Sequence, residues 1–174
     1  AVGAAHAVRI RGGSEVVAAG RYGGTSVWAT TVSSVELVTN GDFSGGSNSW
    51  TWSGDAAYNA DAQRVQLNEE NSAISQSLAL EAGRQYQFEM DIEPWSAGGF
   101  GGGSTTHRVD IALGSASASY SLTAGGGFIS TTLTWDVTAD SGDDLVISRS
   151  GGSPFDVDNL SVTAFGWNTN SPVT

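Results

Sequence analysis

The chain has 174 residues, no Cys and no Lys, and a formal net charge of −11 because 18 acidic residues oppose only seven arginines. This length fits one ordinary domain plus an appendage, and a domain of that size buries roughly two thirds of its unfolded surface without disulfide support. The missing Cys excludes disulfides, Cys-ligated zinc and a thiol nucleophile, the missing Lys excludes a P-loop, and the acidic balance argues against nucleic acid and anionic membranes as partners.

The first 34 residues differ in charge from the rest of the chain. Residues 1–34 carry a net charge of +2, whereas residues 35–174 carry −13. The first segment also has few large apolar side chains, so we expect an extended arm that is held by the body or by a partner. The alternative is a short segment with chance charges. The residues predicted to anchor a partner are Arg9, Arg11, Arg21, Tyr22 and Trp28.

Targeting and membrane signals are not visible in the printed sequence. No charged region followed by an apolar core begins the chain, and no apolar run reaches the roughly 18 residues of a membrane span. We therefore expect a soluble protein without membrane insertion. A signal peptide that had already been removed would leave the same pattern.

The body, residues 35–164, alternates apolar and polar residues in several stretches, which indicates half-buried strands. The clearest is RQYQFEMDI at 84–92, where alternate residues from Tyr86 to Ile92 are apolar. Short strands separated by Gly- and Ser-rich turns predict an all-β, antiparallel sandwich, and residues 165–174 form a C-terminal tail. Further stretches of this kind are 72–80, 108–113, 119–122, 129–137 and 144–148.

Three segments of the body resemble a known family. ELVTNGDFSGG…WTW at 36–52 and FDVDNLSVT at 155–163 resemble the opening and closing strands of galactose-binding-like jelly rolls, in particular the carbohydrate-binding modules of xylanases and cellulases. AISQSLALEAGRQYQFEMDI at 73–92 resembles the central stretch of that family. The resemblance implies a jelly roll whose first and last strands lie side by side. It extends to related domains in bacteriophage fibre and capsid-surface proteins.

The same resemblance implies a structural calcium ion between the first and last strands. It assigns Asp158 as a ligand, with Asp42 and the carbonyl of Asn40 as further candidates, and calcium takes about six to eight oxygen ligands. The apolar spacing within 157–162 breaks strict alternation, which predicts a β-bulge at Asp158 and the residue after it. The alternative is that Asp158 only accepts hydrogen bonds from the first strand.

Sugar binding is the second candidate chemistry, because aromatic rings stack on pyranose faces while amide, carboxylate and guanidinium groups bind hydroxyls. We expect Trp95, the first residue of the Gly-rich stretch WSAGGFGGGSTTH, to be the exposed aromatic side chain on which a sugar stacks. The alternative is that the aromatic side chains belong to the core or to a protein interface. Trp50 and Trp52 have the same strand parity, which leaves open which of them is buried. The candidate glycan-binding residues are Trp95, Phe100, Trp52, Tyr58, Arg64 and Gln66.

Catalysis has little support in the sequence. It contains no G-x-S-x-G or H-E-x-x-H motif, and adjacent carboxylates such as Asp143 and Asp144 point to opposite faces of a strand. The acidic body, the basic arm, the missing export signal and the resemblance together predict a non-enzymatic bacteriophage virion surface protein, a capsid decoration or fibre component, whose arm binds capsid or other virion proteins or sister subunits. A homotrimer would suit that location, and a host-surface glycan is a candidate ligand. The alternative is a secreted carbohydrate-binding module of a glycoside hydrolase or adhesin.

Overall fold

The computed structural model describes residues 34–94, 105–124, 130–139, 142 and 144–165, together with four short strands before residue 34. These residues form strands and turns, as predicted for an all-β chain. Among them, no helix has the length and apolar character needed to cross a membrane.

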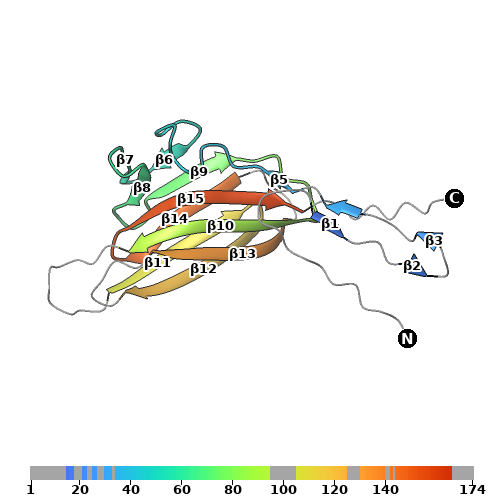
Figure 1. The fold of residues 1–174 in the computed structure, drawn as a ribbon. Coiled ribbons are helices and arrows are strands. Elements are labelled where there is room, and N and C mark those ends of the chain that lie inside the picture. Colours follow the sequence, from blue (N-terminus) through green and yellow to red (C-terminus); the bar gives the residue numbers. More distant parts are fainter. Residues whose placement is uncertain are drawn as a thin grey trace.

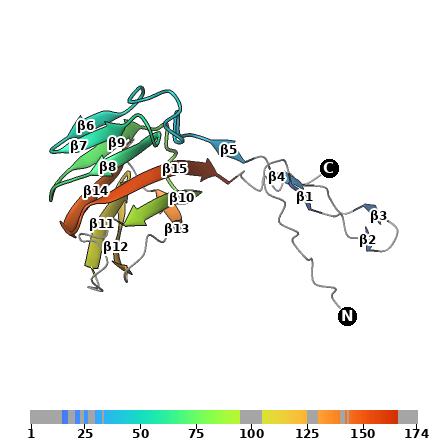
Figure 2. The ribbon, with the colours of Figure 1, turned by 60° about the vertical axis from the view of Figure 1, so that its left-hand side comes forward.

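Two antiparallel sheets face each other to form the body (Figures 1 and 2). The six-stranded sheet has the order β13-β10-β15-β8-β7, with β5 also paired to β15, and the five-stranded sheet has the order β12-β11-β14-β9-β6. The first sheet comprises β5 (Val35–Glu36), β7 (Ala56–Asn59), β8 (Arg64–Leu67), β10 (Arg84–Pro94), β13 (Thr131–Ala139) and β15 (Phe155–Ala164). The second comprises β6 (Thr51–Ser53), β9 (Ala73–Ser77), β11 (Thr105–Leu113), β12 (Ala116–Ala124) and β14 (Asp144–Gly152).

Alternation along the strands produces the core between the two sheets. In β10 the apolar residues from Tyr86 to Ile92 point inward and are buried, while Gln87 and Asp91 lie on the outer side. The five-stranded sheet forms the opposite side of the core. The apolar residues of β11 and β14 follow the same period of two, so they point from one face of that sheet toward β10 and its neighbours. Its fully buried members include Ile74, Val109, Ile111, Leu113, Leu145 and Ile147. The predicted antiparallel sandwich is therefore confirmed.

The first strand of the body pairs with the last, as the resemblance implied. β5 is antiparallel to the C-terminal end of β15. The chain then continues alongside β15, where the Leu37 amide donates to the Val162 carbonyl and the Leu160 amide donates to the Gly41 carbonyl, both at 2.9 Å. β15 itself lies inside the sheet, with β10 on one side and β5 and β8 on the other.

Trp50 secures the Gly- and Ser-rich crossing between β5 and β6. It is 7% exposed, and its ring tilts against that of Phe43 with 5.5 Å between the centroids. Its Nε1 donates to the Asn40 carbonyl at 3.0 Å. Trp52 is half-buried and packs against the core. Of these two tryptophans, Trp50 is thus the buried one.

The region before the body contains two small antiparallel pairs. β1 (Glu15–Val17) pairs with β4 (Thr30–Val32), and β2 (Arg21–Tyr22) pairs with β3 (Thr25–Ser26). The predicted anchor residues Arg9, Arg11 and Trp28 lie outside the described residues, as does most of the C-terminal tail. The boundaries of arm, body and tail therefore stay predictions.

Candidate functional site

Four carboxylates gather on the outer face of the six-stranded sheet, where β10 and β15 run side by side. The register sets Asp91 opposite Asp158 and Glu93 opposite Asp156. On β10 the residue between the two acidic side chains is apolar and buried, and the same holds on β15. The carboxylates on both strands therefore point away from the core. On the next strand, Gln66 of β8 lies opposite Asp156.

A β-bulge in β15 shapes this surface, as the apolar spacing predicted. The pairing of β10 with β15 is regular up to Glu89 and Ser161 and resumes at Asp91 and Asp158. β15 thus holds one extra residue, and Asn159 has a positive φ of 50°. Because a bulge redirects side chains locally, Asn159 turns toward β10, where its Nδ2 donates to Asp91 Oδ2 at 2.9 Å.

Charge-assisted contacts fix the remaining groups. Arg64 of β8 forms an ion pair with Glu93, and its Nη1 lies 3.9 Å from Oδ2 of Asp156. The Thr132 hydroxyl of β13 donates to Asp91 Oδ1 at 2.6 Å. Side chains from four neighbouring strands therefore form two groups of polar contacts, Asp91 with Asn159 and Thr132, and Arg64 with Glu93 and Asp156. We call the two groups together the polar network. Their contacts hold the side chains in place without a ligand.

This network surrounds an open cleft of about 220 Å³. Its four carboxylates and one guanidinium give the cleft a formal charge of −3. The volume lies below the roughly 300–1,000 Å³ of sites for drug-sized ligands, so it suits a single sugar unit of a longer chain. The cleft is lined by Arg64, Asp91, Glu93, Ser130, Asp156, Val157, Asp158 and Asn159.

Partial burial of its carboxylate sets Asp158 apart in the cleft. Burial raises the pKa of Asp158 above its usual value, the Asn159 amide and Arg64 lower it, and the negative charges of Asp91 and Asp42 raise it. The charged form of Asp158 is therefore less favourable than it would be in water. A ligand that donates hydrogen bonds to this carboxylate would stabilise the charged form.

The remaining predicted calcium ligands lie beside the bulge but already have partners. Oδ1 of Asn40 accepts from the Gly45 amide at 2.8 Å, and the Asn40 carbonyl accepts from Trp50. Asp42 is exposed, and hydrogen bonds from the Ser44 amide and hydroxyl lower the pKa of Asp42. In the described part of the chain, no group of three or more Asp, Glu, His or Cys side chains is arranged to hold a metal. Calcium stays a prediction.

The predicted aromatic platforms divide into two groups. Tyr58 and Trp52 are half-buried against the core, and the Tyr58 hydroxyl donates to the Phe43 carbonyl at 3.2 Å. Trp95 and Phe100 lie outside the described residues. In sequence Trp95 comes two residues after a cleft residue, Glu93.

The histidine of the described residues lies inside the sandwich. His107 is fully buried, with Nδ1 3.0 Å from the Ser153 carbonyl and Nε2 3.0 Å from the Thr105 hydroxyl. Its ring packs edge-on against Phe155. These contacts make His107 a structural residue that joins β11 to the turn between β14 and β15.

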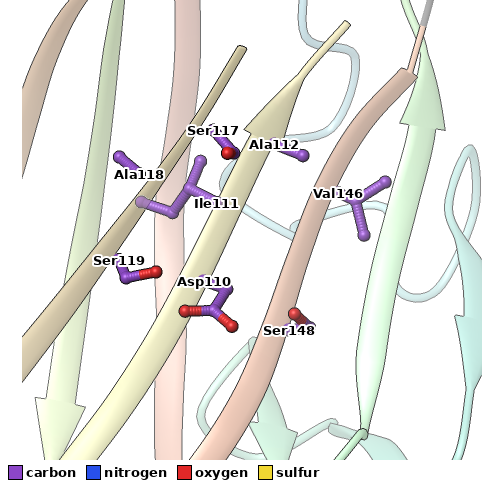
Figure 3. A pocket seen from close by; sticks show the side chains of 8 residues that line it. All are labelled: Asp110, Ile111, Ala112, Ser117, Ala118, Ser119, Val146 and Ser148. Carbon is purple, nitrogen blue, oxygen red and sulfur yellow. The ribbon is translucent and has the colours of Figure 1, made fainter. Parts of the chain in front are cut away.

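A second, smaller hollow of about 160 Å³ lies on the outer face of the five-stranded sheet (Figure 3). Asp110 is its one charged residue, and most of the other side chains, such as Ala112 and Ser148, are small. It offers fewer groups for hydrogen bonding than the cleft. The remaining lining residues are Ile111, Ser117, Ala118, Ser119 and Val146.

Comparison with known proteins identifies the fold. No protein-family model and no curated protein matches the sequence. The tandem module CBM22-1-CBM22-2 of Paenibacillus barcinonensis Xyn10C is similar to this chain with a TM-score of 0.50 and 12% identity over 80% of this chain and 48% of that one. This chain thus spans about half of that structure.

Two further solved structures are similar. Carbohydrate-binding module CBM36 in complex with calcium and xylotriose has a TM-score of 0.45 and 18% identity, over 77% of this chain and 99% of that one. The enzymatically active domain of bacteriophage CBA120 tailspike protein 4 has a TM-score of 0.46 and 14% identity, over 74% of this chain and 21% of that one. The fold of the body is thus a jelly roll like that of carbohydrate-binding modules.

Proposed function

We propose that the body is a non-catalytic carbohydrate-binding domain that binds one unit of a glycan in the polar cleft. The observation that supports the proposal is the pair of neighbouring polar groups on the outer face of the sheet, Asp91 with Asn159 and Arg64 with Glu93 and Asp156. Sugar hydroxyls form a fixed pattern of donors and acceptors, so preorganised carboxylates and amides recognise them well. The carboxylates accept from hydroxyl groups, and Asn159 contributes an amide.

Trp95 and Phe100 are the aromatic residues that we assign to the proposed site. A polar cleft alone binds a sugar weakly in water, because each hydrogen bond between protein and sugar replaces a hydrogen bond to water. An aromatic platform adds burial of the apolar ring face. Since Trp95 closely follows Glu93 along the chain, it is our candidate for that platform, and Gln66 is a further polar contact from β8.

The proposal is tested by a glycan array followed by calorimetric titration of the bound glycans, with and without calcium. Asp91→Ala is expected to weaken binding about tenfold or more, because a hydrogen bond to a charged group contributes about 1.5–3 kcal/mol. Trp95→Ala is also expected to weaken binding, because the apolar face of the sugar ring loses its aromatic contact. Asp110→Ala, an Asp on the outer face of the other sheet, is the matched control and should bind normally. Silence across the array, or unchanged binding by Asp91→Ala, would contradict the proposal.

We propose further that the domain is displayed on a bacteriophage virion, with residues 1–34 attached to capsid or fibre proteins. The supporting observation is the charge difference between residues 1–34, at +2, and the remainder, at −13, which suits attachment to an acidic partner. A secreted carbohydrate-binding module is the competing assignment. Neighbouring capsid and tail genes would support the virion role, and a hydrolase domain encoded in the same reading frame would refute it.

A further inference from the structure

The two sheets end in edges of unequal length. On one side the edge strands are β6, with three residues, and β7, with four. On the other side β12 and β13 each have nine residues. Among the described strands, β12 pairs with β11 alone and β13 with β10 alone. Each long edge therefore carries a row of backbone donors and acceptors that no described strand uses.

β12 lacks the features that usually protect such an edge. Its sequence, ASASYSLTA, contains no charged residue and no Pro, and its register with β11 continues without a bulge. Of the described strands with nine or more residues, it is the one without a charged side chain. β13 differs, because it carries the exposed Asp136, which accepts a hydrogen bond from Gln87 at 3.0 Å. Charges, prolines and bulges are the ordinary barriers to pairing between molecules.

Apolar side chains accompany the open edge. Tyr120 and Leu122 of β12 and Trp135 of β13 pack against the core but are only partly buried. β12 and β13 contact each other across the sandwich, so these three side chains occupy the margin where the core reaches the open side. A strand added to β12 would cover part of this margin.

We propose that the partner of this edge is β12 of a second copy of the chain, paired antiparallel about a two-fold axis. In an antiparallel pair formed by one strand with its own copy, a charge close to the two-fold axis lies near the same charge of the other copy, which destabilises the pair. An uncharged strand in a chain with net charge −11 meets this condition. The interface is isologous and closes at two copies. It joins the two five-stranded sheets into one continuous sheet.

The outer-face side chains of β12 also suit self-pairing. They are exposed, small and hydroxylated, so two copies approach without steric conflict and hydroxyl pairs across the strands add favourable contacts. They are Ser117, Ser119, Ser121 and Thr123. Because both bodies are acidic, screening of their repulsion strengthens the dimer as salt rises.

Sedimentation of the full chain tests the proposal. We expect twice the 17.8 kDa mass of one chain and a dimer that tightens with added salt. The double variant Ser119→Lys, Ser121→Lys should raise the dissociation constant of the dimer at least tenfold, since like charges then face each other. Thr51→Lys with Ser53→Lys, at the opposite edge of the same sheet, is the control and should dimerise normally. A monomer, a trimer, or a dimer indifferent to the β12 lysines would overturn the proposal.

A cysteine scan gives a second readout that does not depend on the lysine variants. The chain has no Cys, so each variant contains one Cys and can form a disulfide only with the same position of a second copy. The positions are Ser117, Ser119, Ser121 and Thr123. Antiparallel self-pairing predicts that the yield of disulfide-linked dimer is highest at the position nearest the two-fold axis and decreases at positions on both sides of it. Uniform crosslinking, or none along β12, would refute the pairing.

Discussion

Replacing Gly152 by alanine is expected to lower the free energy of unfolding by about 3 kcal/mol or more. Gly152 has a φ of 74°, and an added Cβ would lie 2.0 Å from the Thr106 carbonyl oxygen. Left-handed backbone costs alanine about 1–2 kcal/mol. The rest arises because the backbone of β11 must move, which weakens ladder hydrogen bonds of about 1 kcal/mol each, including the bond from the Ser153 amide to Thr106.

Gly83 supplies the matched control. Its φ is 76°, but nothing lies within 4 Å of an added Cβ. Gly83→Ala should therefore lose only the backbone part, about 1–2 kcal/mol. Urea unfolding of the two variants and the parent chain measures the difference. Equal losses would show that the close approach of the β14–β15 turn to β11 contributes nothing to stability.

Phe88→Ala is expected to cost about 3–5 kcal/mol, a large part of the roughly 5–15 kcal/mol that stabilises an ordinary domain. Phe88 is fully buried in the middle of β10, opposite Trp135 on one neighbouring strand and Val162 on the other. Alanine leaves a cavity that the two sheets cannot close, because strands on both sides hold β10 in place. Thermal and urea unfolding of the purified variant give the loss.

Gln87→Ala is the control for Phe88→Ala, because it removes a side chain at nearly the same place on β10 but from the face that is not buried in the core. Gln87 is the preceding residue of β10, faces the opposite side, and donates a hydrogen bond to Asp136. Its removal should cost less than about 1 kcal/mol, as for one exposed hydrogen bond. A loss at Gln87 as large as that at Phe88 would contradict the assignment of the two faces of β10.

Much of the fold follows from local alternation in the sequence. The predicted strand at 84–92 corresponds to β10, and the irregular spacing after Val157 corresponds to the bulge at Asn159. Such signals are visible because one face of each strand is buried and a shift of one residue would reverse the faces. The short strands β6, β7 and β8 are less evident, because three or four residues do not define a period.

The candidate site was only partly foreseeable. Arg64 and Asp158 were candidates from sequence, in separate sugar and metal sites, and the structure brings them into one cleft with Asp91, Glu93 and Asp156. The alternation of acidic and buried residues in β10 and β15 was the available signal. It did not reveal that the two strands are neighbours.

The sequence by itself determined that the chain is all-β, that the body is acidic, and which residues of the long strands face inward, because these properties depend on composition and on a period of two. Tertiary structure alone decided that β15 lies between β10 and β8, that four carboxylates meet one arginine, and that β12 ends a sheet. The physical reason is that strand order depends on pairing between segments far apart in the chain, and neither composition nor local alternation encodes it.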